Sequence, residues 1–171
     1  TGMIRAIGSW VLQQACEQWV RWQQLVLDAG VGDTASPHPL ARVSISVNLS
    51  AAQMSDPALV TDIEALLQRT GMPAHRLELE ITESQLMDNA HAAEQHLAAL
   101  KALGVQLSID DFGTGYSSLA YLKRFDIDRL KVDKSFVRDM LATPADMAIT
   151  RAIIALGHTL GLRIVAEGVE D

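Results

Sequence analysis

Polar and charged side chains stand at or near the ends of segments in which apolar and polar residues alternate, as they do in β-strands. In chain order they are Asn48, Glu80, the adjacent pair Asp110 and Asp111, Lys131 with Asp133, and Glu167. The amide and the carboxylates offer only oxygen ligands, which hard cations such as Mg²⁺ or Mn²⁺ prefer, whereas zinc and copper usually bind His or Cys. Carboxylates brought close together repel one another unless a cation neutralises them. The pattern predicts a divalent-metal site.

The adjacent carboxylates Asp110 and Asp111 suit a site with two metal ions. Asp110 ends a predicted strand facing inward, and Asp111 begins the following loop. Two metals bridged by a carboxylate are a common device for phosphoester hydrolysis, because they clamp the attacking and leaving oxygens and lower the pKa of bound water. Lys131 could orient the attacking water or stabilise charge on the phosphate. The alternative for Lys131 is a structural ion pair with Asp133 or a neighbouring carboxylate.

Residues 110–118 read DDFGTGYSS. Gly113 and Gly115 allow a tight loop whose backbone approaches a phosphate, although this signal alone is weak. The Asp-Phe-Gly triplet also occurs in the metal-binding loop of kinases, but the other kinase motifs do not accompany it. The glycine spacing does not match the dinucleotide-binding fingerprint. We therefore exclude a kinase and a dinucleotide-binding domain.

An alternation of strand and helix patterns must position these side chains. We predict strands at 43–48, 77–82, 105–110, 130–133 and 162–167, helices at 3–29, 56–70, 89–103, 117–124 and 145–160, and a loop at 30–41. Strands that alternate with helices indicate βα units and a parallel sheet. The predicted fold class is α/β.

Each predicted strand has one apolar and one polar face, because successive side chains point to opposite sides. In the second strand, Leu77, Leu79 and Ile81 oppose Glu78, Glu80 and Thr82. Taken singly, this pattern favours a half-exposed antiparallel strand with one solvated face. The intervening helices favour the other interpretation: they cover the apolar faces, the polar faces line the interior of a barrel, and the strand ends form the mouth of a site.

Composition limits the class of protein. The 171 residues make one domain, and the hydrophobic share of 49% excludes a disordered chain. The single cysteine, Cys16, excludes a disulfide framework and a multi-cysteine zinc site, and it suits a reducing cytoplasm. The net charge of −7 argues against binding to duplex nucleic acid. No apolar run reaches the roughly 18 residues that span a bilayer, and the first residues do not read as a signal peptide.

The other residues with chemical potential are expected to be structural. The five histidines form no metal-binding motif and are expected in solvated helices or loops. Cys16 is expected to be a small buried residue. On the helix at 3–29, we expect a buried face made of Ile7, Val11, Cys16, Trp19 and Trp22, and we expect Trp10 to be a core or interface residue.

Six strings follow one another along the chain: IGSWVLQQAC at 7–16, VNLSAAQ at 47–53, LELEITES at 77–84, IDDFGTGYSSLAYLKR at 109–124, LKVDKSFV at 130–137 and AEGVE at 166–170. In their residues and their order they resemble the motifs of the EAL-domain family, the bacterial phosphodiesterases of cyclic di-GMP. The resemblance spans almost the entire chain. It implies a modified TIM-type (βα) barrel that binds cyclic di-GMP at the carboxyl ends of its strands. It also implies hydrolysis of one phosphodiester to linear pGpG with Mg²⁺ or Mn²⁺.

The resemblance also assigns roles by motif position. Asn48, Glu80 and Asp110 resemble ligands of a first metal ion, and Asp110, Asp111 and Glu167 resemble ligands of a second. Glu167 further resembles a general base, Lys131 the group that positions the water, and Glu83 the residue that holds the DDFG loop. The substrate and loop positions are Gly113, Thr114, Gly115 and Asp133. The loop and its following helix often mediate homodimer contact in the family, so we expect a homodimer.

Departures from the family's pattern lie mainly at the ends. The Glu-Ala-Leu motif and the downstream Gln-Gly motif do not occur in the chain, and a whole barrel takes roughly 250 residues. We therefore expect 1–171 to be a partial EAL domain, inactive when isolated, within a cytoplasmic region of a longer protein. That parent is expected to carry a cyclase-like or sensory domain, and regions not seen here could anchor it to a membrane. The alternative function is a cyclic di-GMP receptor without turnover.

Overall fold

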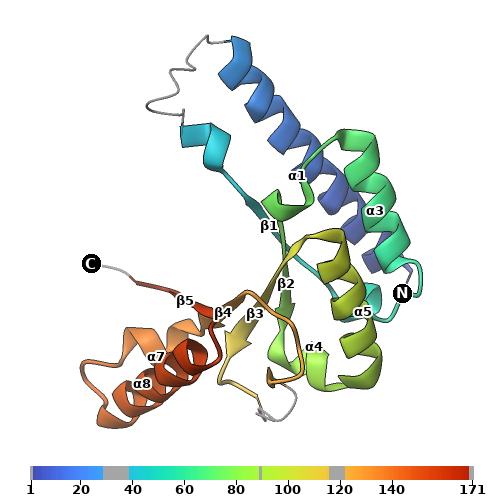
Figure 1. Cartoon of the computed structure of the whole chain (residues 1–171). Helices are drawn as coiled ribbons and strands as arrows, with labels where there is room; N and C mark the ends of the chain where they lie inside the picture. The colour runs from blue at the N-terminus through green and yellow to red at the C-terminus, as the bar shows by residue number, and fades with distance from the viewer. Residues whose placement is uncertain (1, 29–38, 89, 116–121, 170–171) are drawn as a thin grey trace.

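A parallel β-sheet forms the centre of the molecule. The computed structural model describes residues 2–28, 39–88, 90–115 and 122–169. Within these, five strands pair in chain order: β1 (Ile45–Asn48), β2 (Leu77–Thr82), β3 (Gln106–Phe112), β4 (Arg129–Val132) and β5 (Arg163–Ala166) (Figure 1). All neighbouring strands are parallel, which confirms the predicted α/β class. The carboxyl ends of the described strands consequently meet at one edge of the sheet.

Helices connect and cover these strands. In chain order the described ones are α1 (Met3–Asp28), η1 (Pro39–Arg42), α2 (Ala51–Met54), α3 (Leu59–Thr70), η2 (Ala74–Arg76), α4 (Glu83–Asp88), α5 (Ala90–Leu103), α7 (Lys134–Arg138) and α8 (Pro144–Thr159). Helices α1 and α3 lie side by side next to β1, and α7 and α8 lie beside β4 and β5 (Figure 1). None of the described helices combines the length and the apolar character needed to cross a bilayer.

The long elements agree with the sequence prediction, whereas the short ones were not expected. Helices α2, α4 and α7 begin within three residues of the end of a strand and contain six residues or fewer. Such short helices show no hydrophobic periodicity, and polar caps define their starts instead. Ser50 caps α2, and Asp133 caps α7. Residues 117–121 of the predicted helix at 117–124 and most of the predicted loop at 30–41 lie outside the described residues.

The apolar faces of the strands form the core. Leu77 and Leu79 on β2, Leu107 on β3 and Leu130 on β4 have no exposed surface. Burying side chains of this size is the main favourable term in folding, at about 2 kcal/mol each. Their neighbours with opposite orientation are the polar residues, so the two-residue alternation predicted from the sequence places polar side chains on the inner face of the sheet.

Two predictions about the helices are wrong in part. On α1 the buried residues are Leu12, Cys16 and Trp19, whereas Ile7 is 49% exposed. Trp10 is 62% exposed and therefore not a core residue, and its role at an interface stays a prediction. Val11 is also exposed and Trp22 half-buried. The reason is that α1 packs on α3, β1, η1 and α2 through the face that carries Leu12, Cys16 and Trp19. The half-buried His96 is not simply solvated, because its Nδ1 lies 2.8 Å from the carbonyl oxygen of Met54.

Candidate functional site

Three carboxylates converge at the carboxyl ends of β3 and β5. One oxygen from each of Asp110, Asp111 and Glu167 lies within 4.8 Å of the others, and all three residues are half-buried. Asp110 is the interior-facing residue near the end of β3, and Glu167 directly follows β5. The structure therefore brings together three of the residues singled out in the sequence as metal ligands.

The backbone of β3 is irregular where it carries the two aspartates. The pairing of β3 with β4 shifts between Ile109 and Phe112. Asp111 has a φ of 54°, a left-handed conformation that non-glycine residues seldom adopt and that costs about 1 kcal/mol or more. Its backbone N–H donates to Asp110 Oδ1 at 3.0 Å. This irregularity lets two consecutive side chains, which a regular strand would point to opposite faces, serve the same site.

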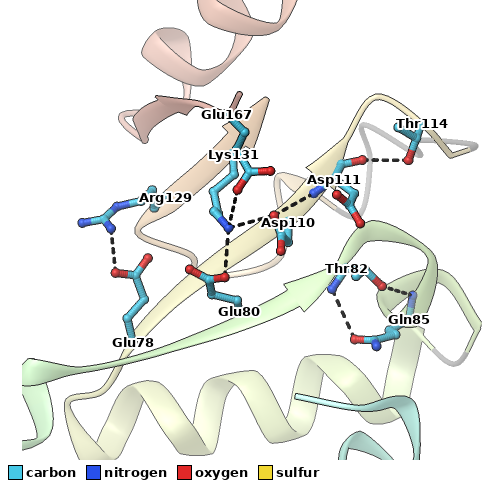
Figure 2. A network of polar contacts seen from close by, with 10 residues as sticks. All are labelled: Glu78, Glu80, Thr82, Gln85, Asp110, Asp111, Thr114, Arg129, Lys131 and Glu167. Carbon is cyan, nitrogen blue, oxygen red and sulfur yellow. Dashed lines mark hydrogen bonds and ion pairs between the residues drawn. The ribbon is translucent and has the colours of Figure 1, made fainter. Parts of the chain in front are cut away.

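Lys131 lies at the centre of the cluster. Its Nζ is 2.9 Å from Glu80 Oε2, 2.9 Å from Asp110 Oδ1 and 2.6 Å from Glu167 Oε1, as Figure 2 shows. Burial acts to lower the pKa of this ammonium, but hydrogen bonds to the three carboxylates outweigh it and raise the pKa above its ordinary value. Lys131 is therefore a permanent positive charge that ties β2, β3 and β5 together from β4. The ion pair weighed in the sequence analysis exists, with these neighbouring carboxylates as its partners.

Asp111 and Asp133 have opposite electrostatic settings. Burial raises the pKa of Asp111, and the negative charge of Asp110 raises it further. The hydroxyl of Ser135 donates to Asp133 and holds the pKa of that carboxyl below its ordinary value. Asp133 Oδ1 also accepts the backbone N–H of Ser135 at 2.9 Å and so caps α7. Asp133 is thus a helix cap at the rim of the site, and its negative charge further raises the pKa of Asp111.

The loop that follows β3 is anchored by Glu83. This buried carboxylate, at the start of α4, accepts the backbone N–H of Gly113 at 3.0 Å through Oε2. A Cβ on Gly115 would lie 3.3 Å from the Glu83 carboxyl carbon, so a larger residue would crowd that anchor. Thr114 donates its hydroxyl to the carbonyl oxygen of Asp111 at 2.8 Å. Gly113, Thr114 and Gly115 thus form a turn, and Glu83 holds it through the hydrogen bond from Gly113.

Asn48 is placed in the site by backbone register. It is exposed at the end of β1, directly opposite Glu80 of β2, and the next N–H, that of Leu49, donates to the Glu80 carbonyl at 2.9 Å. The turn after it is clasped by a capping box between Ser50 and Gln53. Gln53 is a supporting residue that the sequence analysis missed, although a serine followed three residues later by glutamine is a recognised helix-start signal.

The ion pair between Glu78 and Arg129 was also missed in the sequence analysis. Arg129 Nη1 lies 2.6 Å from Glu78 Oε2. In Figure 2 this pair stands beside Lys131 and Glu80, one layer further from the carboxyl ends of the strands. The available signal was spacing: each residue stands two positions before a site residue on the same strand, and therefore on the same face.

The donor set fits a divalent cation. The converging groups carry oxygen ligands. Burial raises the pKa of Asp111 most and the neighbouring carboxylates raise it further, and a bound cation would relieve their mutual repulsion. Loop anchor, carboxylates and lysine lie at the strand ends, the edge at which barrels of parallel strands hold their active sites.

The model of the family described as "EAL domain" matches residues 1–171. The chain belongs to the EAL-domain family. It is 46% identical over 170 residues to the bifunctional diguanylate cyclase/cyclic di-GMP phosphodiesterase MucR of Pseudomonas aeruginosa, covering 99% of the chain and 23% of that protein. It is 44% identical over 171 residues to the cyclic di-GMP phosphodiesterase NbdA of the same organism, covering 99% of the chain and 20% of that protein. The chain thus spans about a fifth of the length of these relatives.

Solved structures of the family share the fold. A cyclic di-GMP complex of the PaMucR phosphodiesterase superposes with a TM-score of 0.87 at 46% identity, over 100% of this chain and 64% of that one. A calcium and cyclic di-GMP complex of Klebsiella pneumoniae BlrP1 gives a TM-score of 0.75 at 30% identity, over 93% of this chain and 37% of that one. The fold is therefore the TIM-type α/β barrel of EAL domains, of which the described strands form an open part.

Proposed function

We propose that the protein carrying this chain hydrolyses cyclic di-GMP to linear pGpG in a reaction that uses two Mg²⁺ or Mn²⁺ ions. The observation that carries this proposal is the convergence of Asp110, Asp111 and Glu167, two of which, Asp110 and Glu167, also contact the Lys131 ammonium. The names of the relatives MucR and NbdA support the substrate, because both are described as phosphodiesterases of cyclic di-GMP.

The site residues divide into two ligand sets. Asn48, Glu80 and Asp110 would hold one ion, and Asp110, Asp111 and Glu167 would hold the other. Bound ions of this kind lower the pKa of water and neutralise negative charge on a phosphate. The number and sign of the charges are consistent with this assignment, since four carboxylates face one ammonium among these side chains.

The remaining residues act on water and substrate. Lys131 keeps the carboxylates in place and positions the attacking water by exchanging one of its three carboxylate contacts for a hydrogen bond to it, a role that its raised pKa supports by keeping it protonated. Glu167 accepts the proton that the water loses. Glu83 holds the loop of Gly113, Thr114 and Gly115 in place beside the metal ligands, where the loop would contact the substrate. Asp133 caps α7 next to Asp111 and so fixes the rim of the site.

The wider assembly is part of the same proposal. The protein acts in the cytoplasm, as a homodimer whose contact involves the loop after β3 and the segment that follows it. A cyclase-like or sensory domain elsewhere in the protein regulates it. The two functions in the name of the relative MucR support such an arrangement.

The decisive experiment is hydrolysis of cyclic di-GMP by the full protein with Mg²⁺ or Mn²⁺, resolved by chromatography. Asp110→Asn should abolish pGpG formation, whereas Asp62→Asn, which removes an exposed carboxylate on α3, should leave it unchanged. Cyclic di-GMP that binds to the wild-type protein without being hydrolysed would overturn the proposal in favour of a receptor.

A further inference from the structure

Two ion pairs cross the inner face of the sheet in the same way. Glu80 on β2 pairs with Lys131 on β4 at 2.9 Å, and two residues earlier on each strand Glu78 pairs with Arg129 at 2.6 Å. Figure 2 shows the two pairs next to each other. The upper pair belongs to the site, and the lower pair has the same charges one layer beneath it.

Both pairs reach over β3, which separates β2 from β4 in the sheet. The register places Ser108 of β3 between Glu80 on one side and Arg129 on the other. Ser108 is 1% exposed, so its small side chain lies beneath the two crossing pairs. A larger residue at that position would occupy the space that the long side chains of the lower pair cross.

In the lower pair, a single ion pair among the described residues compensates the buried charge of Glu78. Glu78 is 2% exposed, and its Oε1, like the Ser108 hydroxyl, has no hydrogen-bond partner among the described residues. The contact with Arg129 is therefore the one ion pair that compensates the Glu78 charge within the described part of the chain. A buried charge that loses its partner is left uncompensated, which is unfavourable and favours a new contact with a group of opposite charge. In the layer above, the charges of opposite sign are Lys131 for Glu78 and Glu80 for Arg129.

We propose that Glu78 and Arg129 are positioning residues that keep the two charges above them available to the site. Because Arg129 pairs with Glu78, Lys131 stays with the site carboxylates. Because Glu78 pairs with Arg129, Arg129 does not compete with a cation for Glu80. The inference rests on the proposed function for its kinetic consequence, but its effect on cation binding is independent of turnover.

The test uses Arg129→Met, Glu78→Gln and the double variant in the full protein, each measured for Mn²⁺ affinity by paramagnetic resonance and for kcat and KM with cyclic di-GMP. Arg129→Met should lower kcat by about tenfold with little change in KM, since Lys131 is drawn down to the unpaired Glu78. Glu78→Gln should weaken Mn²⁺ binding by about fivefold or more, since the released Arg129 competes for Glu80. The double variant, with neither charge, should recover both quantities to within about threefold of wild type.

The matched control is Lys101→Met, which breaks another partly buried ion pair, to Asp128 at 2.7 Å, away from the strand ends. It should lower the melting temperature without changing Mn²⁺ affinity or the kcat. A double variant that is no better than the singles would show a purely structural role and overturn the proposal. If Arg129→Met does not fold, folded Glu78→Gln with wild-type Mn²⁺ affinity overturns it equally. A wild-type protein that binds Mn²⁺ but forms no pGpG would contradict the proposed function alone, and the Mn²⁺ titrations would still decide on the pair.

Discussion

Glu83 and Gly113, thirty positions apart, meet through a hydrogen bond of 3.0 Å from the Gly113 N–H to the Glu83 carboxylate. The contact joins the start of α4 to the loop after β3, next to the two aspartates of the site. A Cβ on Gly113 would lie 2.9 Å from the Phe136 ring, so the loop is held by Glu83 on one side and closely packed on the other. The position of Asp111 consequently depends on a residue of the preceding βα unit.

The substitution Glu83→Gln tests this anchor. The glutamine side chain would keep an acceptor of the same size but lose the charge, and a hydrogen bond to a charged group contributes about 1 kcal/mol more than a neutral one. We expect kcat for cyclic di-GMP to fall by about tenfold with little loss of global stability. Steady-state kinetics and urea unfolding measure the two effects, and Ser84→Ala, at the exposed neighbouring position, is the control. Equal kinetics for both variants would contradict the anchor.

Lys131→Met should separate cation binding from turnover. The variant removes the one ammonium that contacts Glu80, Asp110 and Glu167, so their negative charges are left uncompensated. We expect Mn²⁺ to bind about tenfold more tightly, while kcat falls by about a hundredfold or more because the attacking water loses its positioning group. Calorimetric titration and the pGpG assay measure these quantities. Lys134→Met, at an exposed lysine nearby, should change neither, and weaker Mn²⁺ binding in Lys131→Met would contradict the argument.

Gly8→Ala should destabilise the protein although alanine favours helices. A Cβ at this position in α1 would lie 2.3 Å from the Gln53 carboxamide, which clasps the turn after Asn48. Overpacking costs about 1 to 3 kcal/mol, against a gain of about 1 kcal/mol in helix propensity. We expect a net loss in the free energy of unfolding by urea, and weaker Mn²⁺ binding because Asn48 moves.

Two further variants test the cause of that loss. Gly2→Ala, with no atom within 4 Å of the added Cβ, should be neutral. In a Gln53→Ala background the Gly8 substitution should lose most of its cost, since the clashing carboxamide is gone. A cost that persists in that background would point to another cause.

Cys16 makes stability depend on pH in the alkaline range. Burial raises the pKa of its thiol from 9.0 to about 11, and the side chain is fully buried. Folding favours the protonated thiol, so this contribution is complete below pH 9 and is lost as the pH rises through about 11. The loss amounts to about 2 to 3 kcal/mol.

Urea unfolding between pH 8 and 11 measures it as the difference between wild type and Cys16→Ala, which cancels the other titrating groups. The wild-type advantage should shrink across this range. Parallel curves for the two proteins would contradict the burial of the thiol.

The sequence by itself determined which side chains share a face. Glu80 on β2 and Lys131 on β4 were predicted to face the interior, because alternation in a strand has a period of two and can be read from a few consecutive residues. The βα order predicted the parallel sheet, and the carboxyl ends of parallel strands meet at one edge. The approximate location of the site followed from these local rules, and the motifs of the family indicated its chemistry.

Tertiary structure decided which of these side chains are partners. The pairing of Glu78 with Arg129 across Ser108, the three contacts of Lys131 and the packing of Gly8 on Gln53 depend on register between strands and on how α1 lies over the sheet. The positive φ of Asp111 follows from a shift in pairing between β3 and β4. Likewise, the exposure of Ile7 and Trp10 depends on what α1 packs against. A local pattern gives the direction of a side chain, but distances between elements are set by the packing of the entire core.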